Sequence, residues 1–93
     1  MAAAAQSASA LMRALGNEQR LLVLCHLSEG EASVGALLER LPLSQSALSQ
    51  HLAKLREGGF VKTRREAQQV FYSLPKGPAR SLVAMLHKLY CPR

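Results

Sequence analysis

The chain has 93 residues, with 12 lysines and arginines against six glutamates and no aspartate, which gives a formal net charge of +6. This length predicts one domain over residues 1–93 with a single modest core. The positive excess favours a polyanionic partner, nucleic acid first and an anionic membrane surface second, because each neutralised phosphate releases counterions. The sequence shows no residue constellation for acid-base, metal or nucleophilic catalysis, and therefore argues against an enzyme.

Hydropathy argues against both a membrane span and an export signal. The longest apolar stretch, residues 21–25, is far shorter than the roughly 18 residues that a span requires. The alanine-rich residues 1–10 lack a basic leader, and Gln6, Ser7 and Ser9 interrupt the alanines. We therefore expect a cytoplasmic protein without a membrane partner, whose two cysteines rest as thiols in a reducing compartment.

Three helices are predicted in the first half of the chain, over about residues 3–15, 18–28 and 34–41. The Gly16-Asn17 pair ends the first helix and caps the second. Gly30 ends the second helix, and Ser33 begins the third. Apolar residues surround most of the second helix, which predicts a central position in the fold; they are Leu21, Leu22, Leu24, Cys25 and Leu27.

A fourth helix follows the tight break Pro42-Leu43-Ser44, with Ser44 as its cap, so the third and fourth helices form a helix-turn-helix. Leu48, Leu52 and Leu55 define its buried stripe, and the helix ends at Gly58-Gly59. The opposite face carries small hydroxyls and an amide, whereas a merely solvated helix would carry mostly Glu and Lys. Ser46, Ser49 and Gln50 are therefore candidates for base contacts in a DNA groove. The expected phosphate-contacting or supporting residues of this helix are Gln45, His51 and Lys54.

Two strands are predicted next, over residues 60–66 and 69–74, joined by a polar tip at Ala67-Gln68. A hairpin after a helix-turn-helix is typical of a winged helix. Its tip would place Arg64, Arg65 and Gln68 near phosphates or a minor groove. The alternative is that the arginines only protect a solvated hairpin edge from pairing.

A last helix is predicted from Pro78 to about Tyr90. It has more apolar residues than one contact face needs, including a second line of Val83 and Met85. We therefore expect the first and last helices to form a homodimer interface; its predicted residues are Leu11, Leu15, Leu82, Leu86 and Leu89. The predicted fold class is mainly α with a small β-hairpin, a winged helix-turn-helix ordered as four helices, two strands and one helix.

Three phrases carry a family resemblance: Ala14-Leu15-Gly16-Asn17-Glu18-Gln19-Arg20-Leu21, Ser44-Gln45-Ser46-Ala47-Leu48-Ser49-Gln50-His51-Leu52 and Leu55-Arg56-Glu57-Gly58-Gly59-Phe60-Val61. With them the chain resembles ArsR/SmtB-type winged-helix repressors over essentially its full length. The segment 64–72 and the ending Leu86-His87-Lys88-Leu89-Tyr90-Cys91 look most like the branch of BigR, SqrR and HlyU. The resemblance implies a homodimer that binds an inverted repeat in double-stranded promoter DNA and releases it when an inducer alters the dimer.

Many members of this family sense metals, but the expected ligands are missing here. Ser33-Val34-Gly35 stands where metal and arsenic sensors have two cysteines. The other familiar site uses Asp and His on the last helix, and this chain offers only His87 there. His26 and His51 stand alone on other helices. We expect no metal and no other cofactor.

Cys25 and Cys91 remain as candidate sensors. Composition alone favours Cys25 as a small buried apolar residue. The resemblance instead implies a redox pair, in which oxidation or persulfide sulfur links Cys25 to Cys91 and releases the DNA. The alternatives are a regulator of the same family with inert cysteines that senses another signal, or one that displaces another repressor. A winged helix used for protein interaction is disfavoured by the Ser and Gln on the fourth helix.

Overall fold

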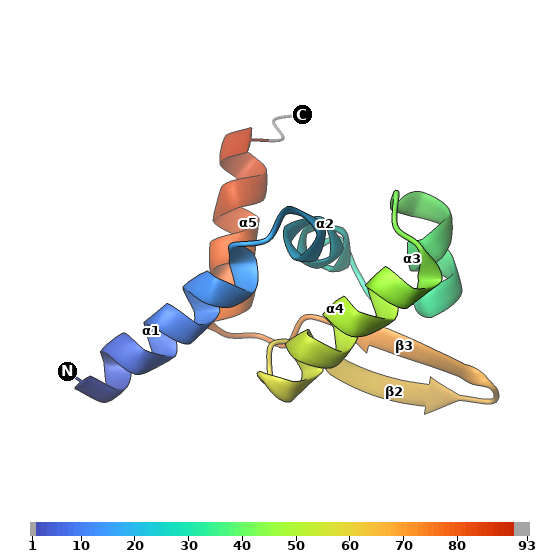
Figure 1. The fold of residues 1–93 in the computed structure, drawn as a ribbon, viewed down its shortest axis with the longest axis horizontal. Coiled ribbons are helices and arrows are strands. Elements are labelled where there is room, and N and C mark those ends of the chain that lie inside the picture. Colours follow the sequence, from blue (N-terminus) through green and yellow to red (C-terminus); the bar gives the residue numbers. More distant parts are fainter. Residues whose placement is uncertain (1, 91–93) are drawn as a thin grey trace.

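The computed structural model describes residues 2–90, and Figure 1 shows a group of helices from which a β-hairpin projects. The predicted fold class, mainly helical with a small antiparallel hairpin, is confirmed. Within residues 2–90 the elements are α1 (Ala2–Leu15), α2 (Glu18–Leu27), β1 (Ala32–Ser33), α3 (Val34–Arg40), α4 (Gln45–Glu57), β2 (Lys62–Glu66), β3 (Gln69–Ser73) and α5 (Pro78–Tyr90).

The helix starts follow from side-chain caps that the sequence predicts. The side chains of Asn17, Ser33 and Ser44 accept hydrogen bonds from the backbone N–H three residues later, at 3.0, 3.1 and 3.1 Å. Each cap satisfies a donor that the first helical turn leaves unpaired. Arg20 fixes the α1–α2 corner, because its guanidinium donates to the backbone carbonyls of Ala14 and Arg13.

The sheet contains a strand that the sequence reasoning missed. Strand β1 has two residues and pairs antiparallel with β3, opposite the side of β3 that pairs with β2, so the order is β1-β3-β2. In register, Ser33 lies opposite Phe71, and Phe71 lies opposite Arg64. The base of the hairpin is therefore joined to the start of α3, and this joint limits how the hairpin can tilt.

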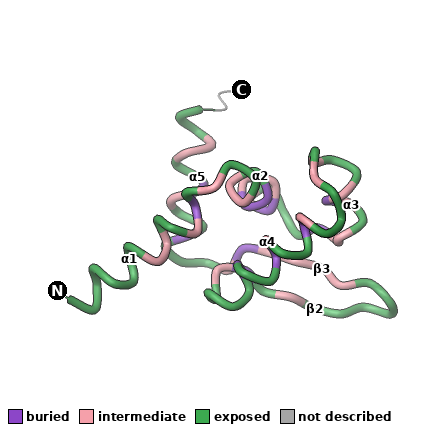
Figure 2. Tube along the Cα trace, in the orientation of Figure 1, coloured by how far each residue is buried: buried purple, intermediate pink, exposed green. Residues whose placement is uncertain are grey.

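The core forms around α2, as predicted, and Figure 2 shows its buried segments at the centre of the molecule. Val23, Leu24 and Leu27 of α2 are buried. Leu22 is exposed, so one side of α2 faces away from the core. The inner face of α4 and residue Leu37 of α3 complete the helix-turn-helix part of this core. Among the described residues, no helix combines the length and the hydropathy needed to cross a membrane.

Candidate nucleic-acid interface

Helix α4 has two sharply different sides. Leu48, Leu52 and Leu55 are at most 2% exposed, so the predicted buried stripe is confirmed. The outward side chains predicted to meet DNA are exposed; they are Gln45, Ser46, Ser49, Gln50 and Lys54. Within residues 2–90, the side chains of Ser49, Gln50 and Lys54 make no hydrogen bond, so they are available to a partner.

The start of α4 suits an anionic partner. Its first turn has no acidic residue, and the aligned peptide dipoles place partial positive charge at this end. The Ser44 hydroxyl is occupied by its cap and lies 3.4 Å from the Ser46 hydroxyl. The Ser46 side chain is therefore exposed and lies beside the first turn of α4.

His51 faces α2 instead of the outer side of α4. Its Nε2 lies 2.8 Å from the Gln19 Oε1, and its Nδ1 is buried without a hydrogen-bond partner in the described chain. Burial, together with the nearby charges of Arg20 and Lys54, lowers the pKa of this imidazole. This contact joins α4 to α2, and the two roles expected for His51, a phosphate contact or support of the turn, stay predictions.

The turn after α4 sets the start of the hairpin. Gly59 adopts a φ of +76°, Gly59 N–H donates to the Arg56 carbonyl and Phe60 N–H donates to the Leu55 carbonyl. This is the Schellman pattern, in which a left-handed residue ends a helix and satisfies its last carbonyls. The Phe60 ring folds back over Gly58, where an added Cβ would lie only 2.5 Å from the ring.

The two faces of the hairpin differ. Tyr72 borders a hollow that is shared with Ser49 and Ala53, so the face of β3 that carries Tyr72 is turned toward α4. Phe71 instead borders a hollow formed by the α2–β1 segment. Because side chains alternate along a strand, Arg65 belongs to the face turned toward α4 and Arg64 to the other face.

Arg64 has partners within the described chain that the sequence does not predict. Its Nε and Nη2 donate to the two carboxylate oxygens of Glu31, both at 2.8 Å, and its Nη1 donates to Glu66 at 2.7 Å. Its guanidinium carbon also lies 4.6 Å from the centre of the Phe71 ring. Neighbouring carboxylates hold the pKa of Arg64 above its usual range. Arg64 is thus paired with two carboxylates of the same chain. Arg65 forms no ion pair with another residue in 2–90, and Gln68 is exposed at the tip of the hairpin.

Helices α1 and α5 expose several large apolar side chains. Leu15 is only 8% exposed and Val83 is fully buried, because both pack into the core of this chain. Leu11, Leu82 and Leu86 are partly buried against the same core. Of the predicted interface residues only Leu89 is largely exposed; the other exposed large apolar residues are Met12, Leu22, Met85 and Tyr90.

The candidate cysteine pair is described for one member only. Cys25 is partly buried, packs against the core, and its carbonyl accepts a hydrogen bond from the Ser28 hydroxyl at 2.6 Å. Cys91 lies outside the described residues. The last turn of α5 lies beside the end of α2, since the His87 Nε2 is 3.7 Å from a Glu29 carboxylate oxygen. In the described part of the chain, no three His, Cys, Asp or Glu side chains gather in a group that could hold a metal ion.

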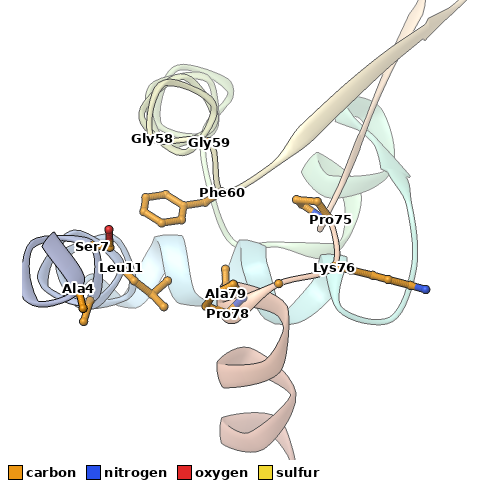
Figure 3. Close-up of a pocket in the computed structure, with 12 residues that line it drawn as sticks. Ala4, Ser7, Leu11, Gly58, Gly59, Phe60, Pro75, Lys76, Pro78 and Ala79 are labelled. Atoms are coloured by element: carbon orange, nitrogen blue, oxygen red, sulfur yellow. The ribbon is translucent and has the colours of Figure 1, made fainter. Parts of the chain in front are cut away.

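A cavity of about 480 Å³ lies between α1, the α4–β2 turn and the start of α5. Its walls are mainly apolar, with Leu11 of α1 facing Phe60 and Pro78 in Figure 3. The Lys76 amine points away from it. The cavity therefore lacks converging polar groups that would select a particular ligand.

The comparisons with known proteins agree with this geometry. The model of the family described as "Bacterial regulatory protein, arsR family" matches residues 17–63. The chain belongs to the ArsR family of bacterial regulatory proteins. It is 56% identical over 81 residues to the transcriptional activator HlyU of Vibrio cholerae, covering 87% of this chain and 75% of that one. The chain is thus a DNA-binding transcriptional regulator rather than an enzyme.

Solved structures of this branch have the same fold. Reduced HlyU from Vibrio cholerae superposes with a TM-score of 0.93 at 52% identity, covering 98% of this chain and 96% of that one. The transcriptional repressor BigR from Xylella fastidiosa superposes with a TM-score of 0.86 at 40% identity, covering 96% and 91%. The resemblance to ArsR/SmtB-type regulators of the HlyU and BigR branch is therefore confirmed.

Sequence reasoning missed the contacts that Glu31 and Phe71 make with Arg64 of the hairpin. A two-residue strand gives almost no periodic signal, so nothing in the sequence marks Glu31 as a neighbour of the hairpin. Phe71 was assigned only to a strand. The alternation of Phe71 and Tyr72 is the one available sign that the two strand faces have different neighbours.

Proposed function

We propose that two copies of this chain form a dimer that binds an inverted repeat in promoter DNA in the bacterial cytoplasm. Each copy would insert α4 into a major groove, with Ser46, Ser49 and Gln50 toward base edges. The observation that carries the proposal is the outer side of α4, which is exposed, free of acids in its first turn and opposite a fully buried leucine stripe. Lys54 of α4 and Arg65 of the hairpin would neutralise phosphates.

The proposed dimer uses the apolar face of α1 and α5. Met12 is 62% exposed and Tyr90 is 79% exposed, which favours burial against a second copy. Symmetric pairing would present two copies of α4 about one helical turn of DNA apart, roughly 34 Å. A dimer held by these residues would be weakened by Met85→Glu and Leu89→Glu. The matched control is Ala84→Glu, which adds the same charge at an exposed position of α5 away from that face.

The experiment for this function is selection of bound duplexes from a randomised library, followed by titration of the selected site. We expect a palindromic consensus and binding that falls steeply with salt, because each neutralised phosphate adds about 0.9 to the salt slope. Tight binding by a strict monomer, or selection of sequences without any shared motif, would contradict the proposal.

For regulation, we propose that Cys25 and Cys91 form the sensor. Hydrogen peroxide would remove one hydrogen from each thiol to give a disulfide and two waters. A persulfide donor would act as both sulfur source and oxidant, so that two donor molecules give a trisulfide bridge and release two donor thiols and one hydrogen sulfide. The contact between Glu29 and His87 supports a link at this end of α2 and α5. Such a bridge would change the separation of the two α4 helices and so weaken simultaneous binding of both half-sites.

Intact mass after treating the reduced protein with peroxide or a persulfide donor tests this sensor. We expect loss of two hydrogens, or that loss plus whole sulfur atoms, together with DNA release. The Cys25→Ser variant should keep its DNA when treated. Release by that variant would favour the alternative of inert cysteines and another signal.

The sign of regulation is proposed as repression, as for BigR among the relatives. HlyU is a transcriptional activator, so a regulator of the same fold also raises transcription. A reporter placed downstream of the selected site distinguishes the two. Repression predicts higher reporter output in cells that lack the gene for this protein.

A further inference from the structure

Arg64 lies in one outer strand of the sheet, and Glu31 lies just before the other outer strand. Phe71 of the middle strand is between them. Glu31 directly precedes β1, Phe71 is in β3, and Arg64 is in β2. The Arg64 guanidinium crosses the Phe71 ring to reach both carboxylate oxygens of Glu31. A bidentate pair fixes direction as well as distance, which a single ammonium contact does not.

We propose that Glu31 and Arg64 are positioning residues for DNA binding, which together hold the hairpin at the angle that presents Arg65 and Gln68 to DNA. This inference rests on the proposed DNA contact of the hairpin. Besides this pair, the described chain joins the hairpin to the α2–α3 region through the two-residue ladder of β1 with β3 and through the packing of α3 against β3. The Glu31–Arg64 pair adds a side-chain contact that runs from β2, across β3, to the residue before β1.

Charge balance supports positioning over a direct phosphate contact. Arg64 is surrounded by two carboxylates, so the group of Glu31, Arg64 and Glu66 has a net charge of −1. It also lies on the face of the hairpin opposite to that turned toward α4. A phosphate would have to replace two charge-assisted hydrogen bonds while approaching two negative groups.

The test measures affinity and salt slope for the selected DNA site with the full-length protein and four single variants. Glu31→Gln breaks the pair between hairpin and loop. Glu66→Gln makes the same change in net charge and removes a partner of the same arginine, but leaves the link to Glu31. We expect Glu31→Gln to weaken binding roughly 3- to 10-fold relative to Glu66→Gln. The salt slope of Glu31→Gln should stay at the wild-type value.

Two arginine variants separate the roles further. Arg64→Lys keeps the charge but cannot reproduce the two-pronged contact, so we expect it to weaken binding about as much as Glu31→Gln, with an unchanged salt slope. Arg65→Gln should instead lower the salt slope by about 1, because it removes a phosphate contact. The proposal is overturned if Glu31→Gln binds as tightly as Glu66→Gln, or if Arg64→Lys binds like the wild type.

Hydrogen exchange tests the proposal without DNA. We expect faster exchange at the one β1 amide that donates to β3 in Glu31→Gln than in Glu66→Gln, since the ladder loses the support of the Glu31–Arg64 pair. Equal exchange in the two variants would overturn the positioning role. If the wild-type protein bound no DNA at all, the proposed function would fail, and the exchange result would still decide whether the pair holds the hairpin.

Discussion

The outer side of α4 and the β2–β3 hairpin both carry side chains suited to DNA, but they differ in how these side chains are used within the molecule. On α4, Ser49, Gln50 and Lys54 are exposed and make no side-chain hydrogen bond within the described chain. On the hairpin, Arg64 is held by Glu31 and Glu66 while its neighbour Arg65 belongs to the face turned toward α4. A basic residue in a wing is therefore a DNA candidate only after its internal partners are known.

The largest expected effect separates the two sides of α4. Leu52 is 2% exposed, so Leu52→Ala should lower the free energy of unfolding by about 2–5 kcal/mol through lost burial and a residual cavity. Ser49→Ala on the opposite side should change it by less than about 0.5 kcal/mol. Urea denaturation of the two variants checks this, and similar losses in both would contradict the assigned helix orientation.

The next effect concerns what each outward side chain reads. Gln50→Ala should reduce the discrimination between selected and scrambled sites by roughly 1–3 kcal/mol, because a base-specific contact is lost. Lys54→Ala should weaken binding to both sites similarly, since phosphates are present in every sequence. Competition titrations with the two duplexes measure this. Unchanged site preference in Gln50→Ala would remove Gln50 from the base-reading residues.

A smaller effect tests the start of α4. Ser44→Ala removes the cap that accepts from the Ala47 N–H and should lower the free energy of unfolding by about 1 kcal/mol. Ser46→Ala is the matched control, because Ser46 is exposed and accepts no backbone hydrogen bond of the first turn. Equal destabilisation of both variants in chemical denaturation would argue against the capping role.

The smallest predicted effect depends on pH and concerns the side of α4 that faces α2. The pKa of His51 is lowered in the folded chain, so the unfolded chain takes up this proton first as the pH falls below about 6.5. Stability from neutral His51 is therefore present above that pH and lost below it. His51→Gln should show a weaker loss of thermal stability on acidification than the wild type. An identical pH dependence in both proteins would contradict this.

The sequence was sufficient for the features that a helix displays periodically. The leucine stripe of α4, the caps at Asn17, Ser33 and Ser44, and the start of α5 at Pro78 all follow from local patterns. The exposed apolar residues of α1 and α5 were less predictable, because periodicity does not tell which apolar residues pack into the chain's own core. Leu15 enters that core while Met12 remains exposed.

The role of Arg64 depends on a contact across 33 positions of sequence, which no local pattern reports. Strand alternation alone separates Arg64 from Arg65 but does not say which of them faces α4. That choice requires the register of β1 with β3 and the position of Glu31 beside it. Short strands and long-range ion pairs are thus where sequence reasoning stops in this molecule.

Methylation interference on the selected DNA site tests the central account most directly, because a methyl group on guanine N7 lies in the major groove. Insertion of α4 from each copy of a dimer predicts two clusters of interfering guanines about 10–10.5 base pairs apart, centre to centre. In Gln50→Ala, interference should persist at the same positions. A site at which N7 methylation has no effect on binding would contradict the placement of α4 in the major groove.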